Sequence, residues 1–169
     1  MIEKITQPEV QLLLQGEKVL IQTSLESSNG EAVTIECYII PTDSPRKWIL
    51  VTALANQVAI GFVDGIFYGE HGTSKVEAPH TMRVNDPTFA HKEIRYESGD
   101  DGLFVKSSER QKKIGTTLMA TIRQIFIGLG AKMMLVNQVK ESAEGFYQKL
   151  GMQPTMGGFQ ENFDNNDIE

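Results

Sequence analysis

A cluster of basic residues stands immediately before an amphipathic segment in the stretch LFVKSSERQKKIGTTLM, residues 103–119. The first turn of a helix exposes unpaired backbone N–H groups and the positive end of the helix dipole, and both attract anions. Arg110, Lys112 and Lys113 add positive charge there, and Gly115 has no Cβ to keep a ligand from the backbone. The stretch is therefore a candidate pyrophosphate site, the alternative being a solvated basic loop before an ordinary helix.

Two common phosphate-binding motifs are absent. The sequence contains neither GxxxxGK(S/T) nor GxGxxG. The candidate site is therefore neither a nucleoside-triphosphate P-loop nor a dinucleotide fingerprint.

The elements that must position this loop are predicted from the pattern of apolar residues. Residues 103–105 favour a strand, and residues 114–129 carry apolar residues at helical spacing. Residues 133–136 read as a buried strand, and residues 141–150 read as a helix closed by Gly151. The order strand, helix, strand, helix predicts two parallel neighbouring strands joined by a right-handed crossover.

The first half of the chain is predicted to be mostly strands. A short helix at residues 8–15, which could equally begin a strand, precedes them. The turn signal SSNG lies at residues 27–30, and residues 55–57 form a tight connection. Residues 70–100 read as a long excursion with a short strand at 92–97. The four main strands are predicted at residues 17–25, 33–40, 48–54 and 58–69.

Composition limits the class of protein. The 169 residues carry a net charge of −6 with 40% hydrophobic residues, which indicates one globular domain and argues against a nucleic-acid partner. Cys37 is the one cysteine, so no intramolecular disulfide forms and no zinc ligand cluster is expected. No apolar run reaches the length of a membrane span, so we expect no membrane partner. The single cysteine is typical of a reducing compartment, so we expect a cytoplasmic location. Residues 160–169 are expected to form an acidic tail.

The stretch RQKKIG resembles the acyl-CoA loop of the GNAT superfamily of N-acetyltransferases, whose signature is Q/R-x-x-G-x-G/A after the fourth strand. Arg110 matches the first position of the signature and Gly115 matches the last. Lys113 stands where the central glycine is usual.

A second match lies downstream, where MLVNQVKESAEGFYQKLGM is similar to the strand, helix and closing segment A-x-x-FY-x-KLGF of the same family. Met152 replaces the usual aromatic residue, and Lys140 stands where many members carry an asparagine. The resemblance spans residues 103–152. The matching positions of the closing segment are Ala143, Phe146, Tyr147, Lys149, Leu150 and Gly151.

The resemblance implies a single α/β (α+β) domain over residues 1–169, with a mixed central sheet flanked by helices and acyl-CoA bound at a splay between central strands. Residues 1–100 would form the acceptor side, and residues 101–152 would bind the acyl-CoA. Phe104 and Val105 would offer backbone groups to the pantetheine arm. The residues implied to contact acyl-CoA are Phe104, Val105, Arg110, Gln111, Lys112, Lys113, Ile114, Gly115, Thr116 and Lys140.

The resemblance also implies an activity, the transfer of an acetyl group from acetyl-CoA to a primary amine by direct attack, without a metal. Tyr147 would be the general acid and Asp101 the general base, with Asp100 and Glu70 as alternatives. One histidine among His71, His80 and His91 could assist.

The acceptor and the other partners are predicted only by class. The acceptor would be a small molecule, a polyamine or a protein amine, and a homodimer is possible. Two other functions stay open. One is a non-catalytic module of the same fold that binds CoA or a protein partner, and the other is a nucleotide-phosphate binder of a different α/β type.

Overall fold

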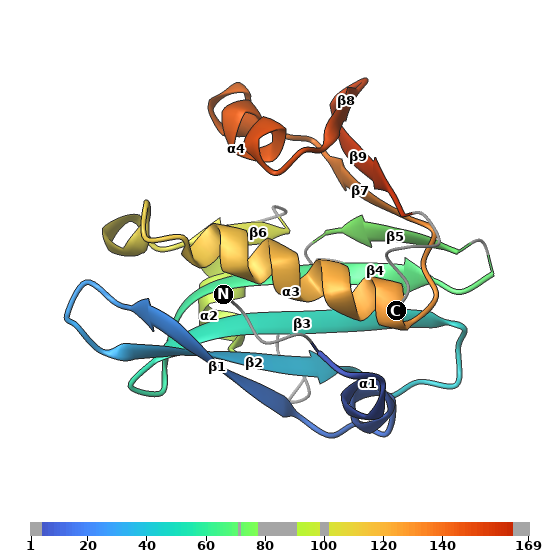
Figure 1. Ribbon diagram of the computed structural model, residues 1–169, viewed down its shortest axis with the longest axis horizontal. Coiled ribbons are helices and arrows are strands. Elements are labelled where there is room, and N and C mark those ends of the chain that lie inside the picture. Colours follow the sequence, from blue (N-terminus) through green and yellow to red (C-terminus); the bar gives the residue numbers. More distant parts are fainter. Residues whose placement is uncertain (1–4, 71, 78–90, 99–101, 164–169) are drawn as a thin grey trace.

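One mixed sheet of nine strands organises the residues that the structure, a computed structural model, describes, namely 5–70, 72–77, 91–98 and 102–163 (Figure 1). The strands are β1 (Val19–Glu26), β2 (Ala32–Ile39), β3 (Arg46–Ala55), β4 (Val58–Tyr68), β5 (Thr73–Val76), β6 (Leu103–Val105), β7 (Met133–Asn137), β8 (Gln153–Thr155) and β9 (Gly158–Asn162). Their order across the sheet is β1-β2-β3-β4-β5-β7-β9-β8, and β6 also pairs with β4. The mixed sheet flanked by helices is the predicted fold class.

Four α-helices accompany the sheet in the described residues: α1 (Gln7–Leu14), α2 (Lys92–Ser98), α3 (Ile114–Gly128) and α4 (Glu144–Lys149). Two 3₁₀ turns, η1 (Ser107–Glu109) and η2 (Glu141–Ala143), precede α3 and α4. The predicted helices at 8–15 and 114–129 are confirmed. The predicted helix at 141–150 consists of η2 followed by α4.

The segment from α1 to β4, residues 7–68, forms the predicted elements because its local signals agree, and of the two alternatives for residues 8–15 it forms the helix. The side chain of Thr6 caps α1 in a reciprocal capping box with Glu9. The four predicted strands are β1 to β4, paired antiparallel in sequence order. Asn56 and Gln57 both have positive φ, 50° and 65°, which suits a tight turn between twisted strands.

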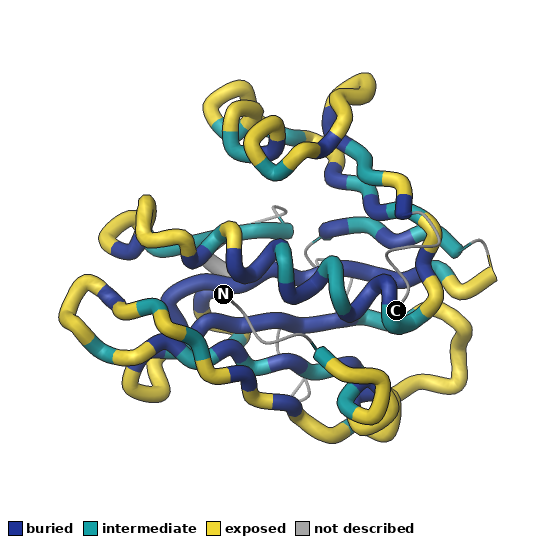
Figure 2. Tube along the Cα trace, viewed as in Figure 1, coloured by how far each residue is buried: buried dark blue, intermediate teal, exposed yellow. Residues whose placement is uncertain are grey.

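Helix α3 lies across one face of the sheet and buries its apolar stripe there (Figures 1 and 2). Ile114, Leu118, Ile122, Ile125 and Phe126 are all buried, because their 3–4 residue spacing places them on one side of the helix. Helix α3, with 15 residues, is the longest of the described helices. None of the described helices is long and apolar enough to cross a membrane.

Cys37 lies in the same core and has no exposed surface. Burial raises the pKa of its thiol, so the group behaves as a small hydrophobic side chain.

Strands β5 and β6 occupy consecutive stretches of the same edge of β4. β5 runs antiparallel along residues 65–68 of β4, and β6 runs antiparallel along residues 61–63. The two strands are therefore successive pieces of one interrupted strand, although residues 77–102 separate them in the sequence. The TSKV segment of β5 was not among the predicted strands.

The pairing of β7 differs from the prediction. The sequence predicts that residues 103–105 and 133–136 are parallel neighbours, but β7 pairs in parallel with β5 and antiparallel with β9. Within the described residues β6 takes its partner only from β4, so β6 and β7 diverge past the last β5–β7 pair, Val76 and Val136. This divergence is the splay between central strands implied by the family resemblance.

The predicted strand at 92–97 is wrong, because residues 92–98 form the helix α2. Phe62 and Val63 are adjacent in β4 and therefore point to opposite faces. Phe62 packs with Ile94 of α2, whereas Val63 joins the core beneath α3. Helix α2 thus covers the face opposite α3. The edge of β4 that residues 92–97 would need as a strand is occupied by β5 and β6.

The C-terminal segment also corrects the prediction. Residues 160–162 of the expected acidic tail belong to β9, and Phe163 is buried. The hairpin of β8 and β9 was not predicted, because its strands are short and one of them begins with Gly158, so the apolar alternation typical of a strand is weak. Residues 164–169 lie outside the described residues.

Gly65 gives a test of the packing between α3 and the sheet. A Cβ there would lie 2.7 Å from the Lys75 carbonyl oxygen and 2.7 Å from the Phe126 ring. We expect Gly65→Ala to lower the free energy of unfolding by about 1–3 kcal/mol through overpacking. Gly145→Ala in α4 is the matched control, since no atom lies within 4 Å of its added Cβ. Urea unfolding of both variants checks the prediction, and equal stabilities would contradict it.

Candidate active site

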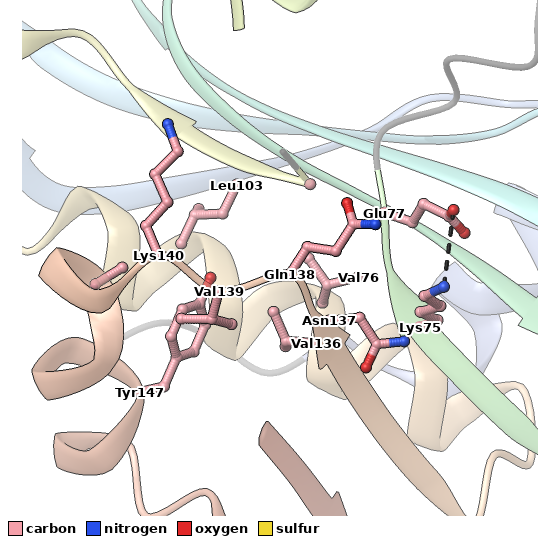
Figure 3. Close-up of a pocket in the computed structure, with 12 residues that line it drawn as sticks. Lys75, Val76, Glu77, Leu103, Val136, Asn137, Gln138, Val139, Lys140 and Tyr147 are labelled. Atoms are coloured by element: carbon pink, nitrogen blue, oxygen red, sulfur yellow. Dashed lines mark ion pairs between the residues drawn. The ribbon is translucent and has the colours of Figure 1, made fainter. Parts of the chain in front are cut away.

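A cavity of about 220 Å³ opens where β6 and β7 diverge. Its walls come from the end of β5, from Gly102 and Leu103, from the end of β7 with the following residues 137–140, and from Tyr147 of α4. Figure 3 shows Tyr147 and Lys140 on one side of the lining and Glu77 and Lys75 on the other. The fold thus brings together residues from both halves of the chain at the splay.

Tyr147 is a buried wall of this cavity, with 6% of its surface exposed. Its ring contacts the Phe146 ring edge-on, with the centroids 5.1 Å apart, and stacks on Phe159 at 5.5 Å. These two contacts fix the orientation of the phenol. A phenolic hydroxyl held in a cavity wall can donate a proton to a bound group.

Glu77 is a cavity residue that the sequence did not single out. It follows β5 directly, and its Oε1 lies 3.8 Å from the Nζ atom of Lys75. Its side chain is 24% exposed, and its carboxylate is directed toward Lys75 and partly accessible to water (Figure 3). The alternation in TSKVE would have indicated a strand that presents Lys75 and Glu77 on one face.

The other candidate bases stand elsewhere. Glu70 pairs with Arg46 at 3.1 Å and does not line the cavity. His91 Nε2 lies 3.4 Å from a carboxylate oxygen of Glu36 in β2, and His91 does not line the cavity. Asp101, together with the alternatives Asp100, His71 and His80, lies outside the described residues, so the assignment of Asp101 stays a prediction.

The candidate pyrophosphate loop has an unusual backbone. Gln111 and Lys113 both adopt the left-handed conformation, with φ of 63° and 65°, and Lys113 is the N-cap of α3. Alternation of left-handed and other residues turns successive N–H groups toward one side, which creates a concave anion site. The left-handed conformation also explains why a glycine is usual at position 113, since glycine adopts it without a penalty.

The side chains of the loop divide into two groups. Gln111, Lys112, Lys113 and Thr116 are exposed, so their charges and hydroxyl face solvent. Ile114 is buried in the core and offers a ligand only its backbone. A Cβ on Gly115 would lie 3.5 Å from the Phe146 ring, an ordinary contact, so the protein itself does not require glycine there.

Arg110 folds back toward the preceding strand, where its Nε donates a hydrogen bond of 3.0 Å to the Val105 carbonyl. The hydrogen bonds of β6 alternate, with the Gly102 carbonyl and the Lys106 N–H directed at β4. By this alternation the backbone groups of Leu103 and Val105 face away from β4, whereas those of Phe104 face toward it. For a ligand in the splay, the geometry favours Leu103 and Val105 over Phe104.

Glu109 anchors the loop from below. It is buried, with 5% of its surface exposed, and its carboxylate accepts hydrogen bonds from the backbone N–H and the hydroxyl of Ser28. Ser28 lies in the turn between β1 and β2, so the loop before α3 is fixed to the N-terminal hairpin. The sequence gives no local signal for this contact between residues so far apart.

Comparison with models of protein families places the chain in a known family. Residues 21–152 match the model of the acetyltransferase (GNAT) family, from β1 to the residue after Gly151. A search of proteins of curated function finds no match. The family match covers more than half of the chain and includes the loop, the splay and the closing segment. The protein belongs to the GNAT family of acetyltransferases.

Proposed function

We propose that this protein transfers an acetyl group from acetyl-CoA to a primary amine by direct attack. The observation that carries the proposal is the cavity at the splay, which places Tyr147 and Glu77 in one lining. A proton donor and a carboxylate around one small space are the groups that acyl transfer to an amine needs.

The acyl donor is proposed to lie along β6 and the loop before α3. The outward backbone groups of Leu103 and Val105 are suited to the amide groups of the pantetheine arm. The loop from Arg110 to Gly115 is suited to the pyrophosphate, because its N–H groups, the helix dipole and three basic side chains act together. Thr116 and Lys140 would add polar contacts at the two ends of the donor.

The reaction needs a neutral amine, a polarised carbonyl and a proton for the departing sulfur. The amine nitrogen forms a bond to the acetyl carbon, and the bond from that carbon to sulfur breaks. We assign removal of the amine proton to Glu77, with Asp101 as the alternative base. Tyr147 donates its phenolic proton to the thiolate, since a phenol with a pKa of about 10 can protonate such a leaving group at neutral pH.

A binding and turnover experiment tests the function. Acetyl-CoA at about 100 times its dissociation constant stabilises a protein by about 2.7 kcal/mol, and we expect a clear rise in Tm. ATP at the same concentration is the control, and it should give no rise. Release of the CoA thiol is then followed with a panel of small amines, polyamines and peptides. Because Cys37 is buried, a thiol reagent should detect product CoA with little background from the native protein.

The outcomes separate the competing functions. A rise in Tm with acetyl-CoA and amine-dependent thiol release supports the acetyltransferase. A rise in Tm without release for any acceptor supports a non-catalytic module that binds CoA. A larger rise with ATP supports a nucleotide-phosphate site.

Lys113→Gly tests the strained backbone of the loop. A non-glycine residue in the left-handed region costs about 1–2 kcal/mol, and glycine loses about 0.5–1 kcal/mol through its unfolded-state entropy. We therefore expect Lys113→Gly to raise the free energy of unfolding by about 0.5 kcal/mol. Lys112→Gly removes the same charge at a position without positive φ and should not stabilise. A Lys113→Gly variant less stable than Lys112→Gly in chemical denaturation would contradict the loop geometry.

Tyr147→Phe tests the proton donor. The variant keeps the ring contacts with Phe146 and Phe159 but loses the hydroxyl. We expect turnover to fall by roughly 10²-fold while the dissociation constant of acetyl-CoA changes by less than about 3-fold. Steady-state kinetics and calorimetry measure the two quantities. Equal losses in turnover and affinity would indicate that Tyr147 packs and does not donate.

Glu77→Gln tests the base that the structure brings to the cavity. We expect kcat to fall by roughly 10²-fold with acetyl-CoA affinity retained, because the amide cannot accept the amine proton. Glu70→Gln is the matched control, since Glu70 lies on the preceding strand end and outside the cavity lining. If Glu77→Gln keeps full turnover, the base is another group, and Asp101→Asn is the next variant to measure.

A further inference from the structure

A buried ion pair stands opposite the interruption between β5 and β6. The Nη2 atom of Arg95 lies 2.7 Å from Oδ1 of Asp64, and its Nε donates to Oδ2. Both side chains are almost fully buried, with 1% and 0% exposed for Arg95 and Asp64. Nη2 also donates to the hydroxyl of Thr52 at 3.0 Å. A forked guanidinium on a carboxylate fixes direction as well as distance.

The pair connects α2 to the face of the sheet opposite α3. The guanidinium carbon of Arg95 lies 4.9 Å from the centre of the Phe62 ring, and Ile94 packs beside it. Burial raises the pKa of the Asp64 carboxyl, and the Arg95 guanidinium opposes that rise. Removing either partner would leave a buried charge without its counterion.

The backbone of the same Asp64 joins both ends of the interrupted strand. Its N–H donates to the Gly102 carbonyl at 2.8 Å, and its carbonyl accepts from the Glu77 N–H at 2.9 Å. Glu77 and Gly102 therefore share one position opposite Asp64, and both line the cavity. One residue thus binds α2 through its side chain and the two cavity segments through its backbone.

The junction of the two pieces is tight. A Cβ on Gly102 would lie 2.6 Å from the Glu77 nitrogen and 2.7 Å from a methyl carbon of Val76. Small shifts of Asp64 therefore move Glu77 and Gly102 together, since no space remains between them to absorb the change.

The energetics of such pairs indicate what this one does. A buried ion pair adds little net stability compared with apolar residues of similar size, because desolvation offsets the attraction. Its directional hydrogen bonds instead select one arrangement of the groups that it joins. In this fold those groups are α2, the junction and the wall that carries Glu77.

We propose that Asp64 and Arg95 are positioning residues for the acceptor side of the cavity. Their buried pair holds the interrupted strand in one register and thereby fixes Glu77 where it can accept the amine proton. The inference rests on the proposed acetyl transfer for its catalytic consequence, while the fixed register can be measured without any substrate.

Hydrogen exchange tests the register directly. The amides of Asp64 and Glu77 report the two bonds at the junction, and the amide of the buried Ile35 in β2, between β1 and β3, reports global opening. The variant is the double substitution Asp64→Leu with Arg95→Met, which removes both charges and so avoids an unpaired one. We expect the two junction amides to exchange at least about ten-fold faster, with Ile35 unchanged.

A second ion pair in the protein provides the matched control. Arg123 and Glu161 also form a close pair beside an aromatic ring, that of Phe163, but they do not line the cavity. The double substitution Arg123→Met with Glu161→Leu should leave the junction amides as slow as in the unmodified protein. Unchanged junction amides in the Asp64/Arg95 variant, or equal acceleration of Ile35, would overturn the inference.

Kinetics provide the second readout once an acceptor amine is in hand. We expect the Asp64/Arg95 variant to lose at least about ten-fold in kcat/KM for the amine, with acetyl-CoA affinity within about 3-fold of the unmodified protein. Equal losses in both would indicate a general structural role and overturn the inference. Failure of the proposed function would show as absent turnover in the unmodified protein, while the exchange result stands separately.

Discussion

Asp64 directs one N–H and one carbonyl to the edge of β4 that faces away from β3, and the two groups bind different segments of the chain. The N–H holds Gly102 at the start of β6, and the carbonyl holds Glu77 at the end of β5. Because β7 continues beside β5 and not beside β6, the sheet opens at this residue. The cavity forms because β5 and β6 share this edge of β4 while β7 follows only β5. The gap between β6 and β7 becomes the cavity.

Helix α3 completes the site from the other direction. Its buried stripe packs over β3 and β4 close to the opening, and Gly65 permits the approach of Phe126. That packing places the N-terminus of α3 at the end of β6. The left-handed residues Gln111 and Lys113 then turn the chain into the helix within a few residues. The strain at these two positions is balanced by the buried Ile114 on one side and the anchored Glu109 on the other.

Much of this arrangement could be predicted from local patterns. Strands β1 to β4 and helix α3 carry clear periodicity, and the family resemblance singled out Tyr147, which lines the cavity. The roles of Tyr147 and of the loop from Arg110 to Gly115 stay predictions. The missed features depend on contacts between distant residues. The KEIRYES segment forms helix α2, in which Ile94 and Arg95 contact residues of β3 and β4. These partners are distant in the sequence, so the local pattern could not indicate them. Glu77 was missed because the alternation in TSKVE covers only one short strand, whose partners β4 and β7 are distant in the sequence.

The contact between Glu109 and Ser28 has a consequence for how the fold can be divided. Residues 103–152 contain both motifs of the family resemblance, yet the loop within them is held by a turn near the other end of the chain. The carboxylate of Glu109 is buried, so a fragment without the first hairpin would leave it without these two donors. This half of the chain therefore depends on the first hairpin for the two donors that bind the buried Glu109 carboxylate. A chimaera that exchanges this half between two relatives must carry the matching hairpin with it, and natural recombination within the fold faces the same condition.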